Sequence, residues 1–247
     1  MAISQSPRKK YGSRRKRQKS TPLYREGNVV RIRRSKFNDI RANDDFISMI
    51  RIGRVLNALN FTMQLIIENK TIDSAVGRRN HYRTNFNAGG FLYEGLLLVD
   101  DLRSKYANDD SFTILRDLPF KTSDRRRKIV KTIRDNVAFH FDHKNNTVRP
   151  TLENLNTDYF EFYSADGPQL GQFYFNLSDL IDINYILDEL NDDKPERETH
   201  VEIYQVIDDL TAHFVRGAEA FIIGMSRKLG LVPQSGGQLA RTTVPEP

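Results

Sequence analysis

The 247-residue sequence contains no cysteine, which excludes a disulfide framework, a thiolate zinc site and a cysteine nucleophile. It also lacks any run of eighteen apolar residues, so no segment is predicted to span a membrane. The apolar segment of a secretory signal does not follow the basic N-terminus. A chain without cysteine fits a reducing compartment, and we therefore expect a cytoplasmic protein.

Several motifs of known enzyme classes are missing as well. The sequence has no P-loop, no Rossmann glycine pattern and no G-x-S-x-G nucleophile motif. Its paired aspartates are scattered along the chain, which argues against a two-metal nuclease. We expect neither a bound metal ion nor a cofactor.

Positive charge is concentrated at the N-terminus. Residues 1–36 hold 13 of the 38 Lys and Arg residues but one of the 32 Asp and Glu residues, so their net charge is +12 and that of the remainder is −6. Few apolar groups accompany these charges, and we predict a basic, largely disordered tail. It is interpreted as a solubilising segment, a nuclear localisation signal, or an arm that binds nucleic acid. The cations of such an arm include Arg14, Arg15, Lys16 and Arg17.

Apolar residues recur every three or four positions over much of the remaining chain, which is typical of amphipathic helices. Residues 28–37 are expected to be a short strand or an extended arm. We predict a mainly α protein, with a helical bundle of long antiparallel helices over residues 37–230 and a flexible C-terminal tail over residues 231–247. The predicted helices cover residues 44–69, 79–106, 111–118, 123–141, 177–190 and 199–229.

Two segments depart from this helical pattern. Residues 158–176 are rich in alternating aromatic residues on either side of a turn-forming ADGPQLG sequence, so they are expected to form a small β-hairpin insertion. Gly89 and Gly90 interrupt the second helical pattern, where each costs about 1 kcal/mol relative to alanine. Such glycines permit close approach of another helix or a kink, and we favour close helix packing.

The helix predicted over residues 123–141 carries the most informative side chains. With Val137 at the centre of its core-facing side, Arg134 lies about 60° to one side and His140 about 60° to the other. Asn136 precedes His140 by four residues and shares its side of the helix. The angle of about 120° between Arg134 and His140 is wide for one ideal helix. Their contact with one substrate group requires the long reach of the arginine, an unwound turn, or a second copy of the helix across a dimer axis.

The segment Arg134-Asp-Asn-Val-Ala-Phe-His140 resembles the Arg-x(4–6)-His signature of the HEPN superfamily. In that family a polar residue commonly follows the arginine, as Asp135 does here, and the signature lies late in a helix of a helical bundle. The phrase RDNVAFHFD is also similar to motifs in HEPN proteins of bacterial abortive-infection systems. Over residues 40–229 the resemblance is limited to the architecture of a helical bundle.

The resemblance implies a metal-independent endoribonuclease that acts as a homodimer, in the role of a toxin or phage-defence effector. It further implies RNA as the substrate and a cognate antitoxin or defence-system protein as a partner. His140 would transfer a proton at the ribose 2′-hydroxyl or the leaving oxygen, and Arg134 would bind the phosphate. Asn136 would orient His140 or the substrate, and Asp135 would hold or tune Arg134. Many HEPN toxins carry tyrosine two residues after the histidine, but this chain has Asp142, so the resemblance does not extend to control by tyrosine modification there.

Other interpretations of the motif stay open. An arginine and a histidine beside a core helix are more often ion-paired or capping groups than catalysts. His140, Asp142 and His143 together are a polar helix end or a metal site, and the first is favoured because no second ligand cluster accompanies them.

The start of the same helix is basic. Arg125, Arg126 and Arg127 place positive charge against the helix macrodipole, which indicates either contacts to nucleic acid or salt bridges to the acidic body. The alternative to a ribonuclease is therefore a non-catalytic nucleic-acid-binding or scaffolding bundle that acts through its basic tail.

Overall fold

The computed structural model of the protein describes residues 34–69, 75–138, 148–154, 162–163, 174–190 and 195–231. These residues all belong to one structural unit that spans Ile32–Ser235. They are mainly helical, as predicted, and they form a helical bundle. Within these ranges, no helix is long and apolar enough to cross a membrane.

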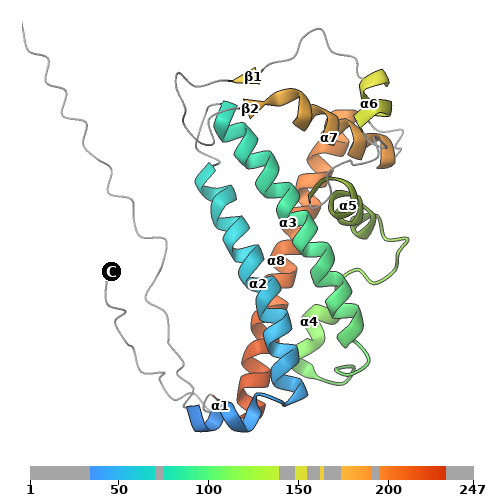
Figure 1. Cartoon of the computed structure of the whole chain (residues 1–247). Helices are drawn as coiled ribbons and strands as arrows, with labels where there is room; N and C mark the ends of the chain where they lie inside the picture. The colour runs from blue at the N-terminus through green and yellow to red at the C-terminus, as the bar shows by residue number, and fades with distance from the viewer. Residues whose placement is uncertain are drawn as a thin grey trace, which may run out of the picture. The chain divides into compact units, whose positions relative to one another are not determined.

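The elements follow one another as short and long helices with one pair of very short strands (Figure 1). In chain order they are α1 (Arg34–Ile40), α2 (Asp44–Asn69), α3 (Ala75–Leu102), a 3₁₀ turn η1 (Asp110–Phe112), α4 (Thr113–Arg116), α5 (Arg125–Ile133), a π-helical turn η2 (Arg134–Ala138), α6 (Val148–Asn154), β1 (Phe162–Tyr163), β2 (Tyr174–Phe175), α7 (Asn176–Leu190) and α8 (Glu196–Lys228).

The three longest helices, α2, α3 and α8, pack against one another and form the centre of the bundle (Figure 1). α2 and α3 run in opposite directions, and α8 packs against both. Each large side chain that is buried in their shared interior stabilises the fold by roughly 1.5–3 kcal/mol. The completely buried side chains of these helices include Ile52, Leu59, Leu92, Leu96, Phe214 and Phe221.

Glycines allow α3 to approach its neighbours closely. A Cβ atom added at Gly95 would lie 2.8 Å from the ring of Phe214 on α8 and 3.0 Å from Val55 on α2. A Cβ atom at Gly89 would lie 3.1 Å from Ile133 on α5. α3 continues through this region without a break, so the prediction of close helix packing is confirmed at Gly89.

The helix boundaries agree with the prediction in some places and differ in others. α2 covers the predicted residues 44–69, whereas α3 begins and ends four residues before the predicted limits of 79–106. The chain turns after Leu102 because the guanidinium of Arg103 donates to the carbonyl oxygens of Arg116 and Leu118, the latter at 2.8 Å, and draws the following loop back against α3.

Two short helices were not predicted. Residues 34–40 form α1, so the expected strand or extended arm over residues 28–37 is wrong for its described part. Tertiary contacts stabilise α1, because Ile40 is buried and the ring of Phe37 packs edge-on against Phe46 with centroids 6.1 Å apart. α6 begins two residues before Pro150, and proline is compatible with the first turn of a helix.

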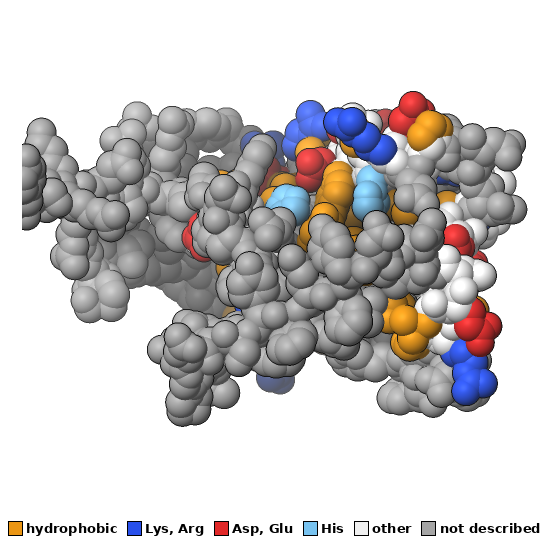
Figure 2. All heavy atoms as spheres, turned by 90° about the horizontal axis from the view of Figure 1, so that it is seen from above, with side chains coloured by type: hydrophobic (Ala, Val, Ile, Leu, Met, Phe, Trp, Pro, Cys, Tyr) orange, Lys and Arg blue, Asp and Glu red, His pale blue; other side chains and the backbone are white. Residues whose placement is uncertain are grey.

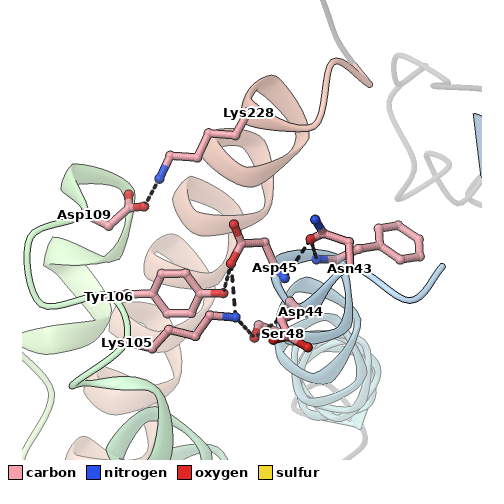
Figure 3. Close-up of polar contacts among 9 residues, drawn as sticks. Asn43, Asp44, Asp45, Ser48, Lys105, Tyr106, Asp109 and Lys228 are labelled. Carbon is pink, nitrogen blue, oxygen red and sulfur yellow. Dashed lines mark hydrogen bonds and ion pairs between the residues drawn. The ribbon is translucent and has the colours of Figure 1, made fainter. Parts of the chain in front are cut away.

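Polar contacts join the end of the bundle where α2 begins and where α3 and α8 end (Figure 3). The side chain of Asn43 caps α2 by accepting hydrogen bonds from the N–H groups of Asp45 at 2.8 Å and Phe46 at 3.1 Å. The hydroxyl of Tyr106 donates to the carboxylate of Asp45 at 2.8 Å, and the ammonium of Lys105 lies 3.1 Å from the same carboxylate. Although partial burial works in the opposite direction, these hydrogen bonds lower the pKa of Asp45.

At the same end, Lys228 in the last turn of α8 forms an ion pair with Asp109, as the upper part of Figure 3 shows. Asp109 is also the N-cap of η1, since its carboxylate accepts from the N–H of Ser111 at 2.9 Å. The C-terminal helix is thereby tied to the loop that follows α3.

The opposite end of the bundle joins α3 to α7 and α8. Arg83 of α3 bridges two carboxylates of α7, at 2.6 Å from Asp179 and 2.7 Å from Asp182. Burial raises the pKa of Asp182, and the neighbouring guanidinium opposes this shift. The rings of His81 and Tyr204 lie 5.7 Å apart between α3 and α8. Figure 2, which views the molecule from this end, shows histidine and apolar side chains next to one another.

The two strands form an antiparallel pair of two residues each, with Phe162 opposite Phe175 and Tyr163 opposite Tyr174. The residues that connect them lie outside the described part of the chain. The predicted hairpin over residues 158–176 therefore stays a prediction beyond these two pairs. Most of the predicted N-terminal and C-terminal tails likewise lie outside the described residues.

Candidate functional site at Arg134

The helix that carries the HEPN-like signature is built from a well-capped start and an apolar inner face. The side chain of Asp124 accepts a hydrogen bond from the N–H of Arg126 at 2.9 Å, and it thereby caps α5. Ile129, Val130 and Ile133 are fully buried and fix this helix against α3. The last of these packs against Gly89, as described above.

The signature itself begins where the α-helix changes into a π-helical turn. The residues of η2 are Arg134–Ala138, and Val137 is buried with 5% exposure. Val137 faces the core, as the sequence pattern predicted, so Arg134, Asp135 and Asn136 lie half-buried at the border of the core. π-helical turns are rare in proteins and occur frequently at functional sites.

Arg134 is held by two carboxylates from different elements. Its Nε and Nη2 atoms both lie 2.7 Å from Oε1 of Glu94 on α3, and its Nη1 donates to Asp135 at 2.9 Å. These hydrogen bonds, first that to Asp135 and then that to Glu94, raise the pKa of Arg134. Asp135 also accepts from Lys131 at 2.6 Å. Although partial burial acts against it, the contacts from Lys131 and Arg134 lower the pKa of Asp135.

A guanidinium has five N–H donors, and the contacts to Glu94 and Asp135 use three of them. The side chain of Arg134 is 32% exposed, so part of it remains open to solvent. Arg134 is therefore oriented by the protein and can still donate to an oxyanion.

Of the other signature residues, the structure describes the side-chain contacts of Asn136 but not His140. The side-chain amide of Asn136 donates to the carbonyl oxygen of Thr132 at 3.1 Å, so it is partly engaged by its own helix. His140 lies outside the described residues, together with Asp142 and His143. The distance between Arg134 and His140 therefore stays a sequence-based expectation.

Each of the three arginines at the start of α5 has a carboxylate partner. This arrangement is the one expected from the salt-bridge interpretation of these residues. Arg125 forms a bidentate pair with Glu202 on α8, at 2.6 and 2.9 Å. Arg126 pairs with the capping residue Asp124 at 2.8 Å.

Arg127 is 4% exposed and lies 2.6 Å from Asp100. Its burial leaves Arg127 little surface for the expected contact with nucleic acid. The tail cations of the same prediction, Arg14, Arg15, Lys16 and Arg17, lie outside the described residues.

Sequence reasoning missed Glu94, which contacts Arg134 from 40 positions earlier in the chain. The signal for it was present, because Glu94 is the one charged residue in the apolar stretch 86–99. A lone charge in such a stretch indicates a position at the edge of the core with a charged partner.

A shallow groove of about 400 Å³ adjoins this site between α2 and α3. Glu94 forms part of its wall, so the groove and Arg134 share one carboxylate. Its lining is mainly apolar and includes two arginines, of which Arg51 is paired with Asp101 at 2.7 Å. The other lining residues are Arg51, Arg54, Val55, Ala58, Phe91 and Leu98.

Within the described ranges, no group of three or more His, Cys, Asp and Glu side chains is arranged to hold a metal ion. Comparison of the chain with protein-family models, with curated proteins and with solved structures finds no match.

Proposed function

We propose that the protein is a metal-independent endoribonuclease of the HEPN type, acting in the cytoplasm as a toxin or phage-defence effector. The observation that carries the proposal is the partly exposed side chain of Arg134, whose guanidinium Glu94 and Asp135 orient and which has further N–H donors for a phosphate. The resemblance of residues 134–140 to the HEPN signature supplies the histidine. The fold of a long-helix bundle agrees with that resemblance, but fold alone does not imply the activity.

In the proposed reaction the 2′-hydroxyl of the RNA attacks the adjacent phosphorus, and the bond from phosphorus to the 5′-oxygen breaks. His140 takes the proton from the 2′-hydroxyl or gives one to the leaving oxygen, and a water molecule serves the other transfer. Arg134 stabilises the negative charge that develops on the phosphate oxygens. The products are a 2′,3′-cyclic phosphate and a free 5′-hydroxyl, so the chain needs no nucleophile of its own.

The charges around Arg134 balance one another, because Arg134 and Lys131 face Glu94 and Asp135. Such a neutral cluster recognises a phosphate by directed N–H groups rather than by net charge. The groove beside Glu94 offers an apolar surface for a neighbouring base. In this proposal a second copy of the chain completes the site, a cognate antitoxin or defence-system protein controls it, and the basic tail over residues 1–36 supplies long-range attraction to RNA.

The test is a cleavage assay on total cellular RNA and tRNA with EDTA present. We expect cleavage by the parent protein with 2′,3′-cyclic phosphate ends. The rate should fall about 10²- to 10⁴-fold in His140→Ala and about 10²- to 10³-fold in Arg134→Ala.

His213→Ala and Arg216→Ala serve as controls, since both residues lie on α8 and their side chains bond to backbone carbonyl groups. These two variants should cleave RNA like the parent. Loss of activity in EDTA would contradict a metal-independent reaction, and undiminished cleavage by His140→Ala would contradict the role of this histidine.

The second candidate function, a non-catalytic nucleic-acid-binding bundle, is favoured by the net charge of +12 in residues 1–36. It predicts that deletion of these residues abolishes RNA binding and that neither the parent nor His140→Ala cleaves RNA. The same samples therefore distinguish the two functions.

A further inference from the structure

A row of basic side chains leads along α5 to the candidate site. Its members are Arg125, Lys128, Lys131 and Arg134, and the spacing of three residues makes each a neighbour of the next on the helix surface. We call these four residues the α5 basic ridge. The side chains of Arg125, Lys131 and Arg134 are 32%, 55% and 32% exposed, and Lys128 is exposed as well.

The charge of this ridge is only partly neutralised. Arg125 pairs with Glu202, and Lys131 and Arg134 share Asp135. Lys128 has no ion pair with any described residue. The ridge therefore carries an uncompensated cation between the start of α5 and Arg134.

An exposed aromatic ring stands at the far end of the ridge, in the loop that enters α5. Phe120 is 57% exposed, although Leu118 and Pro119 immediately before it are buried. The guanidinium of Arg103 lies 4.8 Å from the centre of the Phe120 ring and supports one of its faces. Lys121 follows directly, is exposed, and likewise has no ion pair with a described residue.

The loop under Phe120 is fixed by two arginines that share one carboxylate. Arg103 donates to the carbonyl oxygen of Leu118 at 2.8 Å, and Arg127 donates to that of Pro119 at 3.0 Å. Asp100 binds both, at 3.3 Å from Arg103 and 2.6 Å from Arg127. The ring of Phe120 is thus held outward on a rigid loop, and a base that stacks on it loses little further entropy to loop ordering.

We propose that Phe120 and the lysines of the α5 basic ridge bind single-stranded RNA and lead it toward Arg134. A base stacks on the face of Phe120 that Arg103 does not cover, while Lys121, Lys128 and Lys131 contact successive phosphates. This inference rests on the proposed function for its direction, since it assigns the binding track of that same site.

The dimensions agree with a short strand of RNA. The nine steps from Arg125 to Arg134 rise about 14 Å along the helix axis at 1.5 Å per residue and turn about 180° around it. A strand that follows the row therefore needs at least about four stacked nucleotides at 3.4 Å each. Single-stranded RNA suits the track better than a duplex, because the base faces of a duplex are already stacked and closed to Phe120. An acidic peptide would satisfy the lysines but would leave the ring without a stacking partner.

The experiment measures RNA affinity by fluorescence anisotropy in the full-length His140→Ala protein, so that cleavage does not interfere. The probes are a labelled single-stranded RNA longer than the ridge and the duplex of the same sequence. Phe120→Ala should weaken binding of the single strand about tenfold, the lower part of the range for one stacked base, and should leave duplex binding unchanged. Phe120→Trp should retain the affinity of the parent.

Phe61→Ala is the matched control, because Phe61 on α2 is 62% exposed and lies outside the proposed track. An effect of Phe120→Ala no larger than that of Phe61→Ala would overturn the proposal. An equal loss for the duplex would overturn it too, since the loss would then not come from stacking.

The phosphate contacts have a separate readout. Lys128→Ala should reduce the slope of log affinity against log salt concentration by about 0.7, the value for one phosphate contact on a single strand. Arg216→Ala on α8 should leave the slope unchanged. If Lys128→Ala has the same slope as the parent, Lys128 does not contact an RNA phosphate.

The cleavage assay decides the proposed function independently. Dependence of binding on Phe120 and Lys128, without any cleavage by the parent, would retain the RNA track and reject the ribonuclease. Cleavage by the parent with unchanged binding by the Phe120 and Lys128 variants would support the ribonuclease and reject the RNA track.

Discussion

Arg127→Ala should destabilise the fold far more than removal of its neighbour Arg126. Arg127 is 4% exposed, and its guanidinium contacts Asp100 at 2.6 Å and the carbonyl oxygen of Pro119 at 3.0 Å. Breaking a buried ion pair typically costs about 3–5 kcal/mol, because the remaining charge stays buried without its partner. Asp100 retains Arg103 at 3.3 Å, so we expect the lower end of this range, about 3 kcal/mol.

Urea unfolding followed by circular dichroism measures this loss as a lower midpoint at constant slope. In thermal unfolding a loss of about 3 kcal/mol corresponds to roughly 6–12 °C for a folded unit of this size. Arg126→Ala is the control, because the Arg126 side chain is 52% exposed and such surface pairs contribute only about 0.2–1 kcal/mol. Equal stability of the two variants would refute the structural role of Arg127 and would return this residue to the set of nucleic-acid ligands.

Three further predictions concern the site and the fold. Glu94→Gln should slow RNA cleavage about tenfold by loosening Arg134, and it should not weaken RNA binding in the His140→Ala background because a negative charge is removed. Gly95→Ala should lower the unfolding free energy by about 1–3 kcal/mol, since the added methyl group meets Phe214 at 2.8 Å, and urea unfolding measures this change. The folded-state pKa of Asp45 lies below its unfolded value, so its stabilisation is complete at neutral pH and is lost as the pH falls through the folded pKa. Tyr106→Phe removes one hydrogen bond to Asp45, so urea unfolding should show a smaller stability difference between pH 7 and pH 3 than in the parent.

Local sequence patterns predicted the helices well where capping and periodicity act together. α2 begins after Asn43, whose side chain accepts two backbone hydrogen bonds, and its limits match the prediction. The end of α3 was predicted four residues too late, because the apolar pattern continues to Tyr106. The turn after Leu102 depends on the contacts of Arg103 with a loop more than ten residues away, and a local pattern contains no such information.

In the candidate site, too, features set by the local sequence could be predicted and features set by tertiary packing could not. The placement of Arg134 at the edge of the core follows from the position of Val137 on the helix, and the structure agrees. The lone charge of Glu94 in its apolar stretch indicated a charged partner but not which one, because Glu94 becomes the neighbour of Arg134 only when α5 packs on α3. For the same reason sequence reasoning could not separate buried Arg127 from exposed Lys128, since only tertiary packing decides which face of α5 is covered.

If the protein binds and cleaves RNA as proposed, the arrangement of charge along α5 predicts that different residues carry the attraction and the chemistry. Arg134 has two carboxylate neighbours, so its contribution to non-specific attraction is small, while its directed donors favour a state in which charge develops on the phosphate. Lys121 and Lys128 have no such neighbours among the described residues, and they attract a polyanion regardless of its reaction. Substitution of the lysines should therefore change affinity and salt dependence, whereas substitution of Arg134 should change the cleavage rate with little effect on affinity.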